Sequence, residues 1–364
     1  MIHNPSYINQ PASFESDAII LGIESSCDET AAAIVRGDGH IFANEIASQA
    51  EMHATHGGVV PEIAARSHLD TIGPVIERAL TSANLNPSDL DGIAATGGPG
   101  LIGGVLIGTM TAKSMALALD KPYYAINHLE GHALTARLTD KVEFPYLLLL
   151  ISGGHTQLLA VHGLGQYERY GTTLDDAAGE AFDKGAKLLG LGYPGGPAIE
   201  LAAANGNPKA ITLPNPRSQY DDCHFSFSGL KTALAQKIDA FKDTVSAADF
   251  AASLQLAVCK ALVKRTENAM QKFAAETGAR QLVIAGGVAA NKMIGQGLAD
   301  AAARHAFQLA IPPAGLCTDN AAMIAWAGCE YHAADLPSSL DFAPRPRWPL
   351  DPGAAPPPGR GVRQ

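Results

Sequence analysis

Residues 19–35 read IILGIESSCDETAAAIV, and residues 147–161 read LLLLISGGHTQLLAV. In both segments an apolar run leads into a short polar turn that contains a threonine, and a second apolar run follows. Short apolar runs bounded by turn residues are typical of buried strands. The two segments predict two copies of one strand-turn-strand unit, and hence a chain with two similar halves.

Strand-like segments alternate with alanine-rich helical stretches through the chain, which is typical of an α/β protein. Turns rich in glycine, serine or aspartate follow the strands expected at residues 18–23, 92–96, 146–151 and 281–285. Such turns present backbone N–H groups to anionic oxygens, and glycine permits the close approach of a phosphate. Because turns after parallel strands open at one edge of a sheet, we expect them to converge on a shared cleft.

The segment His128-Leu129-Glu130-Gly131-His132 places two histidines four residues apart. On a helix this spacing puts both imidazoles on one face, where they can close on one metal ion. A zinc-protease helix reads H-E-x-x-H, whereas Glu130 stands two positions after His128, about 200° round the helix, and points away from the metal face. The spacing favours a metal site without protease chemistry. Two ordinary polar histidines at helical spacing are the plainer alternative.

A complete zinc site has three or four ligands, so a further ligand is needed. The best candidate is Asp319, in the segment Thr318-Asp319-Asn320, which opens an apolar run through Trp326. An aspartate at a helix start is also a common N-cap, and this second role for Asp319 stays open.

Length and composition predict a soluble, cytoplasmic protein with a large core. The chain has 364 residues, 47% of them hydrophobic, which is enough for two packed domains. No uninterrupted apolar stretch reaches about 20 residues, and the polar start of the chain is unlike a signal peptide. The five cysteines are scattered without a C-x-x-C pair, which argues against disulfides and against a thiolate zinc site.

The formal net charge of −10 would repel a polyanion at long range. Binding of nucleic acid would therefore depend on a local basic patch or on a partner protein. Residues 1–17 and 344–364 lack apolar periodicity, and the second segment is dominated by proline, glycine and arginine. Both are expected to be disordered.

Several ordered motifs together resemble the universal family of tRNA threonylcarbamoyladenosine synthesis proteins, in its bacterial or organellar branch, across nearly the whole body of the chain. The motifs that carry the resemblance are Leu21-Gly22-Ile23-Glu24-Ser25-Ser26-Cys27-Asp28-Glu29-Thr30, His128-Leu129-Glu130-Gly131-His132, Ser152-Gly153-Gly154-His155-Thr156-Gln157, Gly286-Gly287-Val288-Ala289-Ala290-Asn291 and Thr318-Asp319-Asn320. The resemblance implies a two-lobed α/β ATPase fold of the actin, sugar-kinase and Hsp70 type, with duplicated RNase H-like domains. Subdomain I would hold residues 18–127 and 325–343 and subdomain II residues 128–324, with a metal and nucleotide cleft between the lobes.

The resemblance also implies the residues of the site. One divalent metal, iron or zinc, would be bound by His128, His132 and Asp319, and the turn with Asp28 and Glu29 would face the phosphate region. The residues implied for the acyl-adenylate substrate are Ile151, Ser152, Gly153, Gly154, His155, Asp183, Gly196 and Asn291. Two departures from the family pattern are Leu150, where the archaeal type offers a tyrosine to the metal, and Ile294-Gly295, which replaces a leucine-arginine pair.

The expected reaction transfers a threonylcarbamoyl group from threonylcarbamoyl-AMP to N6 of the adenosine 3′ of the anticodon, in tRNAs that read codons beginning with A. The expected partners are tRNA, an inactive paralogue that forms a heterodimer with this chain, and a small ATPase, with no membrane involved. Two alternatives stay open. A metalloprotease would cleave peptides in a His128-dependent way, and a sugar-kinase-like ATPase would phosphorylate a small molecule without tRNA.

Overall fold

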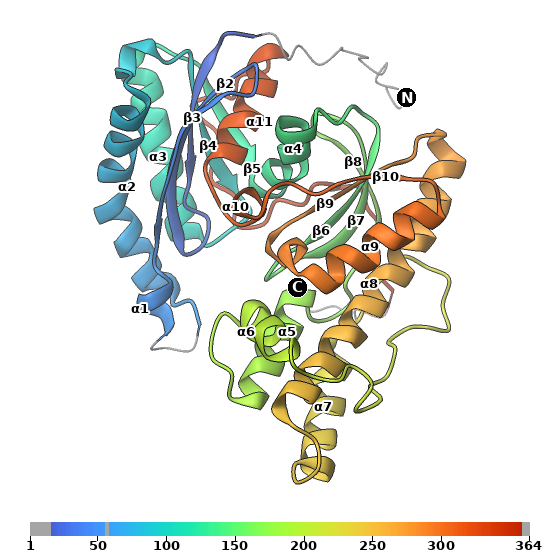
Figure 1. Ribbon diagram of the computed structural model, residues 1–364. Coiled ribbons are helices and arrows are strands. Elements are labelled where there is room, and N and C mark those ends of the chain that lie inside the picture. Colours follow the sequence, from blue (N-terminus) through green and yellow to red (C-terminus); the bar gives the residue numbers. More distant parts are fainter. Residues whose placement is uncertain (1–15, 55–57, 359–364) are drawn as a thin grey trace. The chain divides into compact units, whose positions relative to one another are not determined.

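The computed structural model describes residues 16–54 and 58–358. These residues divide into two units by their internal contacts. Unit 1 holds residues 16–48, 61–131 and 320–347, and unit 2 holds residues 49–54, 58–60, 132–319 and 348–358. Each unit contains one five-stranded mixed sheet accompanied by helices (Figure 1).

The sheet of unit 1 has the strand order β3-β2-β1-β4-β5. Its strands are β1 (Ile19–Glu24), β2 (Glu29–Arg36), β3 (Ile41–Ser48), β4 (Gly92–Gly98) and β5 (Tyr123–Asn127). Strand β2 runs antiparallel to β1 and β3, whereas β4 runs parallel to β1 and β5. The central strand β1 therefore lies between an antiparallel neighbour, β2, and a parallel neighbour, β4.

The sheet of unit 2 has the order β10-β9-β6-β7-β8. Its strands are β6 (Tyr146–Ile151), β7 (Thr156–Gly163), β8 (Gln166–Thr172), β9 (Gln281–Ala285) and β10 (Gln308–Ala310). Here β7 is antiparallel to β6 and β8, and β9 is parallel to β6 and β10. The two sheets share one topology, which confirms the two similar halves predicted from the repeated strand-turn-strand segments, now seen as β1–β2 and β6–β7.

Helices accompany both sheets. Those of unit 1 are α2 (Pro61–Ala83), the 3-10 helix η1 (Pro87–Asp89), α3 (Ile102–Leu119), the start of α4 (His128–Asp140) and α11 (Ala322–Ala333). Those of unit 2 are α1 (Ala50–Ala54), the rest of α4, α5 (Ala178–Leu189), α6 (Gly195–Ala203), α7 (Ser228–Phe241), α8 (Ala247–Thr277), η2 (Gly287–Ala290), α9 (Lys292–Arg304) and α10 (Ala314–Cys317).

A glycine allows the central strand of unit 1 to pack directly on α11. A Cβ atom at Gly22 would lie 2.3 Å from the backbone nitrogen of Ala325 and 2.6 Å from the carbonyl oxygen of Ala321. Side chains cannot be accommodated at such distances, so only glycine permits this approach of a strand to a helix backbone. The position of α11 against β1 therefore depends on the glycine in the first quoted segment.

The described part of the C-terminal segment makes specific contacts. Within unit 1, the Arg345 amide donates to the carbonyl of Gly97 at 2.8 Å. Within unit 2, the Arg169 amide donates to Oδ2 of Asp351 at 2.9 Å, and the side chain of Leu350 is buried. The expectation of a disordered tail does not hold for residues 345–351, because backbone hydrogen bonds and a buried leucine fix them without regular secondary structure. Residues 1–15 and 359–364 lie outside the described residues.

Among the described residues, α3 is the one helix that is long and apolar enough to cross a membrane by length and composition alone. Only 33% of its 18-residue window is buried. The helix packs on α2 and on β4 within unit 1.

Candidate metal centre and substrate turns

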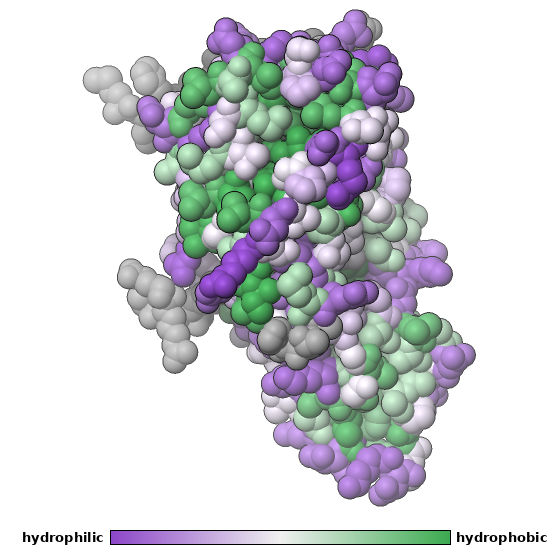
Figure 2. All heavy atoms as spheres, turned by 90° about the vertical axis from the view of Figure 1, so that its left-hand side faces the viewer, coloured by the Kyte–Doolittle hydropathy of each residue, from purple (hydrophilic) through white to green (hydrophobic). Residues whose placement is uncertain are grey.

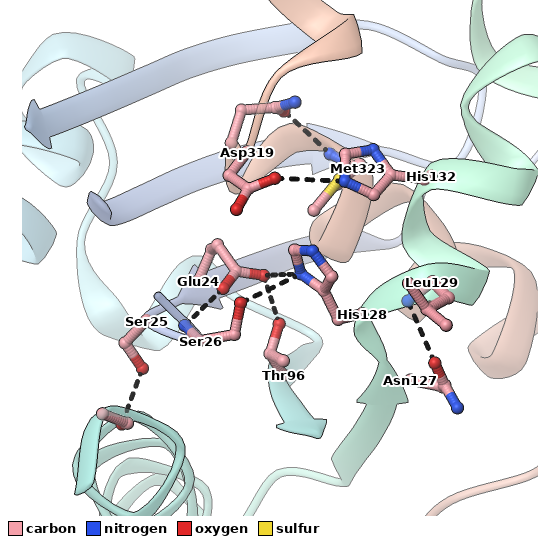
Figure 3. Close-up of polar contacts among 12 residues, drawn as sticks. Glu24, Ser25, Ser26, Thr96, Asn127, His128, Leu129, His132, Asp319 and Met323 are labelled. Carbon is pink, nitrogen blue, oxygen red and sulfur yellow. Dashed lines mark hydrogen bonds and ion pairs between the residues drawn. The ribbon is translucent and has the colours of Figure 1, made fainter. Parts of the chain in front are cut away.

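The two histidines lie on the first two turns of α4, which begins directly after β5 (Figure 3). The helix predicted from their spacing is therefore present. Oδ1 of Asn127 accepts a hydrogen bond from the Leu129 amide at 2.9 Å and so satisfies one of the unpaired donors at the helix start. Both imidazoles are buried, with 9% of His128 and 1% of His132 exposed.

Asp319 lies between α10 and α11, and its Oδ1 is 3.2 Å from Nε2 of His132. The sequence left open whether Asp319 caps the following helix. The cap is instead supplied by Asn320, whose Oδ1 accepts from the Met323 amide at 3.1 Å. The Asp319 carboxylate is thus directed at His132 (Figure 3).

His128, His132 and Asp319 each offer one ligand atom, and these atoms all lie within 4.8 Å of one another. Two imidazole nitrogens and one carboxylate oxygen form a donor set that suits zinc and iron(II). Three protein ligands also leave coordination positions for a substrate. The group can therefore hold one divalent metal ion.

Glu130, the residue between the two histidines, serves another purpose. Its side chain is buried, and its Oε2 accepts a hydrogen bond from the Tyr331 hydroxyl at 2.9 Å. Burial, with the nearby carboxylate as a further cause, raises the pKa of Tyr331, so this hydroxyl stays protonated and can donate. Glu130 thereby joins α4 to α11 within unit 1.

Sequence reasoning missed the residues that surround His128. Glu24, at the end of β1, is 1% exposed and places its Oε2 3.0 Å from Nδ1 of His128. The hydroxyl oxygen of Ser26 lies 3.1 Å from the same nitrogen. The available signal was an acidic residue that ends an apolar strand, where an ordinary interior position would be apolar.

The turn between β6 and β7 is closed by its own backbone. The Ser152 amide donates to the carbonyl of His155 at 2.8 Å, and the His155 amide donates to the Ser152 hydroxyl at 3.2 Å. A Cβ atom at Gly153 or Gly154 would meet no atom within 4 Å. Open space therefore adjoins the two glycines of the turn.

Two other segments of unit 2 approach this turn closely at glycines. A Cβ at Gly286, directly after β9, would lie 2.5 Å from the carbonyl oxygen of Ile151, and one at Gly179 on α5 would lie 2.6 Å from Cα of Gly153. Gly287, the next residue after Gly286, lies close to Thr318: a Cβ atom built there would be 3.8 Å from Cγ2 of Thr318. The turn after β6, the turn after β9 and the residue before Asp319 are therefore neighbours within one unit.

Asp183 and Asn291 also lie in unit 2. Asp183, on α5, accepts a hydrogen bond from the Gly195 amide at 2.8 Å. A Cβ atom at the next residue, Gly196, would meet no atom within 4 Å. Burial raises the pKa of the Asp183 carboxyl, while the hydrogen bond from Gly195 acts in the opposite direction. Asn291 caps α9, since its Oδ1 accepts from the Ile294 amide at 3.1 Å.

The structure also places the other residues that the sequence singled out. Asp28 and Glu29 belong to unit 1, at the start of β2, where Oε1 of Glu29 accepts from the Ser48 hydroxyl at 3.5 Å. Leu150 is fully buried in β6. Residues 294–295 lie in the first turn of α9, with Ile294 buried.

Solved structures define the class of protein. Full-length HypF, crystallised in the phosphate- and nucleotide-bound form, has a TM-score of 0.58 and 15% identity, covering 90% of this chain and 48% of that chain. Component A of the Acidaminococcus fermentans (R)-2-hydroxyglutaryl-CoA dehydratase has a TM-score of 0.52 and 15% identity. The match covers 87% of this chain and 99% of that chain. At such identity the likeness shows the fold alone. The chain is an α/β protein with the actin-like ATPase fold, as expected.

Sequence relatives then define the family. The family model described as tRNA N6-adenosine threonylcarbamoyltransferase matches residues 40–326. A relative of that name from Brucella anthropi is 56% identical over 356 residues, covering 94% of this chain and 98% of the relative. A relative of the same name from Sphingopyxis alaskensis is 57% identical over 346 residues, covering 95% of this chain and 99% of the relative. The chain belongs to the tRNA N6-adenosine threonylcarbamoyltransferase family, and it is a transferase that acts in tRNA modification.

Proposed function

We propose that this chain transfers the threonylcarbamoyl group from threonylcarbamoyl-AMP to N6 of the adenosine 3′ of the anticodon, in tRNAs that read codons beginning with A, and that it does so in the cytoplasm. Membership of the family supports the modification of tRNA. The observation that most supports the details is the group formed by His128, His132 and Asp319. Asp319 follows Thr318, whose Cγ2 lies 3.8 Å from a Cβ atom built at Gly287, in the segment after β9.

In this proposal His128, His132 and Asp319 hold one divalent metal, iron or zinc. When bound, the metal would supply Lewis-acid polarisation of the acyl-adenylate and a fixed point for its orientation. Orientation matters because the exocyclic amine of adenosine is a poor nucleophile, and holding two reactants in place can lower a barrier by several kcal/mol. No side chain is assigned as a general base, since AMP is a weakly basic leaving group.

The residues of unit 2 would bind the rest of the acyl-adenylate. Backbone amides at Gly153 and Gly154 would donate to its phosphate and stabilise the charge that develops on departing AMP. Asp183 would accept hydrogen bonds from ribose hydroxyls, with Gly196 and Asn291 beside the nucleoside. Ile151, Ser152 and His155 would shape the turn, and Asp28 and Glu29 would face the phosphate region.

The proposed reaction is tested directly by supplying tRNA, threonylcarbamoyl-AMP and any required partner proteins, followed by mass spectrometry of the tRNA nucleosides. The expected result is threonylcarbamoyl-adenosine at the position 3′ of the anticodon. Peptide cleavage that depends on His128 would favour a metalloprotease instead. Phosphorylation of a small molecule without tRNA would favour a sugar-kinase-like ATPase.

Replacing Gly154 by alanine is expected to leave the fold intact and to lower kcat/KM for the acyl-adenylate at least about tenfold. The added methyl group meets no protein atom within 4 Å, so it enters the space proposed for the substrate. Thermal unfolding and steady-state kinetics together measure the two effects. The control Gly229→Ala, at an exposed glycine of α7 with equally open surroundings, should leave kcat/KM unchanged. Unchanged kinetics in Gly154→Ala would place the substrate elsewhere.

We also propose that the inactive paralogue binds unit 1 across α2 and α3, and that a small ATPase completes the assembly. The helix α3 exposes one apolar stripe at Ile102, Leu106, Met110 and Leu117, and the adjoining α2 exposes Leu69. Residues at this spacing share one helical face. In Figure 2, which views the side on which α2 lies in Figure 1, apolar residues gather between polar ones. A paralogue of the same fold could offer a matching pair of helices to this stripe.

Replacing Leu106 and Leu117 together by lysine is expected to weaken binding of the paralogue at least about 100-fold, because two charges would be buried at the interface. Light scattering after size-exclusion chromatography of the mixed proteins measures the loss. Leu201→Lys, at an exposed leucine of α6 in unit 2, is the control and should bind normally. Undiminished binding by the double variant would remove this surface from the proposal.

A further inference from the structure

His128 is held by a buried carboxylate to which the proposed reaction assigns no role. Glu24, the last residue of β1, places its Oε2 3.0 Å from Nδ1 of His128, and only 1% of Glu24 is exposed (Figure 3). The two residues are 104 positions apart in the sequence. An ionisable group is rarely buried this fully unless it is paired, so the contact with His128 calls for a physical reason.

Glu24 is itself fixed in one orientation. Its Oε1 accepts a hydrogen bond from the Ser26 amide at 2.5 Å, and its Oε2 accepts one from the Thr96 hydroxyl at 2.5 Å. Thr96, on β4, and Ser26 are both buried. Glu24, Ser26 and Thr96 belong to unit 1, as does His128. The carboxylate therefore reaches the imidazole from the buried end of β1, where two hydrogen bonds orient it.

This arrangement determines which nitrogen of His128 can bind a metal. An ionised carboxylate can only accept a hydrogen bond, so this contact is a hydrogen bond in the tautomer whose Nδ1 carries the proton and donates it to Glu24. In the neutral imidazole the lone pair is then on Nε2. Because a metal ligand needs a free lone pair, Nε2 is the atom that His128 has left to offer.

We propose that Glu24 is a positioning residue that fixes the tautomer and the ring orientation of His128 and thereby strengthens metal binding at His128, His132 and Asp319. A histidine ligand commonly donates its other ring N–H to a carboxylate, which also raises the basicity of the ligand nitrogen. The inference rests on the metal role in the proposed function. Glu24 would act through His128 and would touch neither the ion nor the substrate.

The test measures the dissociation constant of Zn²⁺ by competition with a chromophoric chelator, using the full chain without tRNA. Glu24→Gln is expected to weaken Zn²⁺ binding about 10- to 100-fold, the range typical for loss of such a partner. The matched control is Glu130→Gln, which changes another buried glutamate, on α4, whose Oε2 accepts a hydrogen bond from the Tyr331 hydroxyl. It should alter the constant less than about twofold.

Two further variants separate positioning from general damage. In a His128→Ala background, Glu24→Gln should weaken Zn²⁺ binding no further, because its effect passes through His128. If Glu24→Gln fails to fold, Thr96→Val removes one hydrogen bond to the carboxylate and should weaken binding in the same direction. Thr96→Val with wild-type affinity would then overturn the proposal.

Three results contradict a positioning role. They are wild-type affinity in a folded Glu24→Gln protein, an equal loss in Glu130→Gln, and an undiminished effect of Glu24→Gln in the His128→Ala background. A different result would identify failure of the proposed function itself. In that case His128→Ala would leave the Zn²⁺ affinity of the otherwise wild-type protein unchanged.

Discussion

Replacing His128 and His132 together by alanine is expected to abolish binding of the divalent metal and to lower the rate of threonylcarbamoyl transfer at least about 100-fold. The change removes two of the three ligand groups, and the single carboxylate of Asp319 cannot hold the ion alone. Lewis-acid assistance contributes several kcal/mol, and each 1.36 kcal/mol corresponds to a factor of ten in rate. Elemental analysis of the purified protein and quantification of the modified nucleoside measure the two losses.

A matched control keeps this experiment specific to the site. His162→Ala combined with His305→Ala also removes two histidines, but these contact Glu168 and Glu267 in unit 2 and lie outside the ligand group. The control protein should retain metal and activity. Normal product from the His128→Ala, His132→Ala protein, once stripped of metal, would contradict the metal role.

Replacing Gly22 by valine is expected to destabilise unit 1 by about 3 kcal/mol or more, and expression of folded protein should fall accordingly. The new side chain would meet backbone atoms of Ala325 and Ala321 at 2.3 and 2.6 Å, and backbone atoms cannot rotate away as side chains do. Either β1 or α11 must therefore move. The midpoint of urea-induced unfolding measures the effect.

Gly229→Ala serves as the control for a glycine whose Cβ position is open. Because this glycine lies within α7, alanine should stabilise the protein by up to about 1 kcal/mol or leave it unchanged. An unfolding midpoint of Gly22→Val equal to that of the wild type would show that β1 and α11 are not packed as closely as described.

Local patterns in the sequence predicted much of the fold. The strand expected at residues 146–151 is β6, and the segments at 19–35 and 147–161 proved to be equivalent parts of two sheets of one topology. The order of strands within each sheet could not be predicted in this way. Pairing of β6 with β9 joins segments more than a hundred residues apart, and it depends on long-range packing that a local pattern does not encode.

The candidate site was predictable to a similar extent. Helical spacing singled out His128 and His132, and the chemistry of zinc sites led to Asp319. Asp319 and Asn320 are equally suitable helix caps by residue type, so only the backbone geometry assigns the cap to Asn320. The contact between Glu24 and His128 joins the end of β1 to the start of α4, and no spacing in the sequence brings the two together.

The most direct test of the metal-assisted transfer combines metal removal with the tRNA reaction. Wild-type protein is stripped with a chelator and then supplied with tRNA, threonylcarbamoyl-AMP, the required partners and either no metal, Fe²⁺ or Zn²⁺. Mass spectrometry of the nucleosides should show threonylcarbamoyl-adenosine falling at least about 100-fold on stripping and returning with one of the metals. Equal product in the stripped and the reloaded protein would contradict the account.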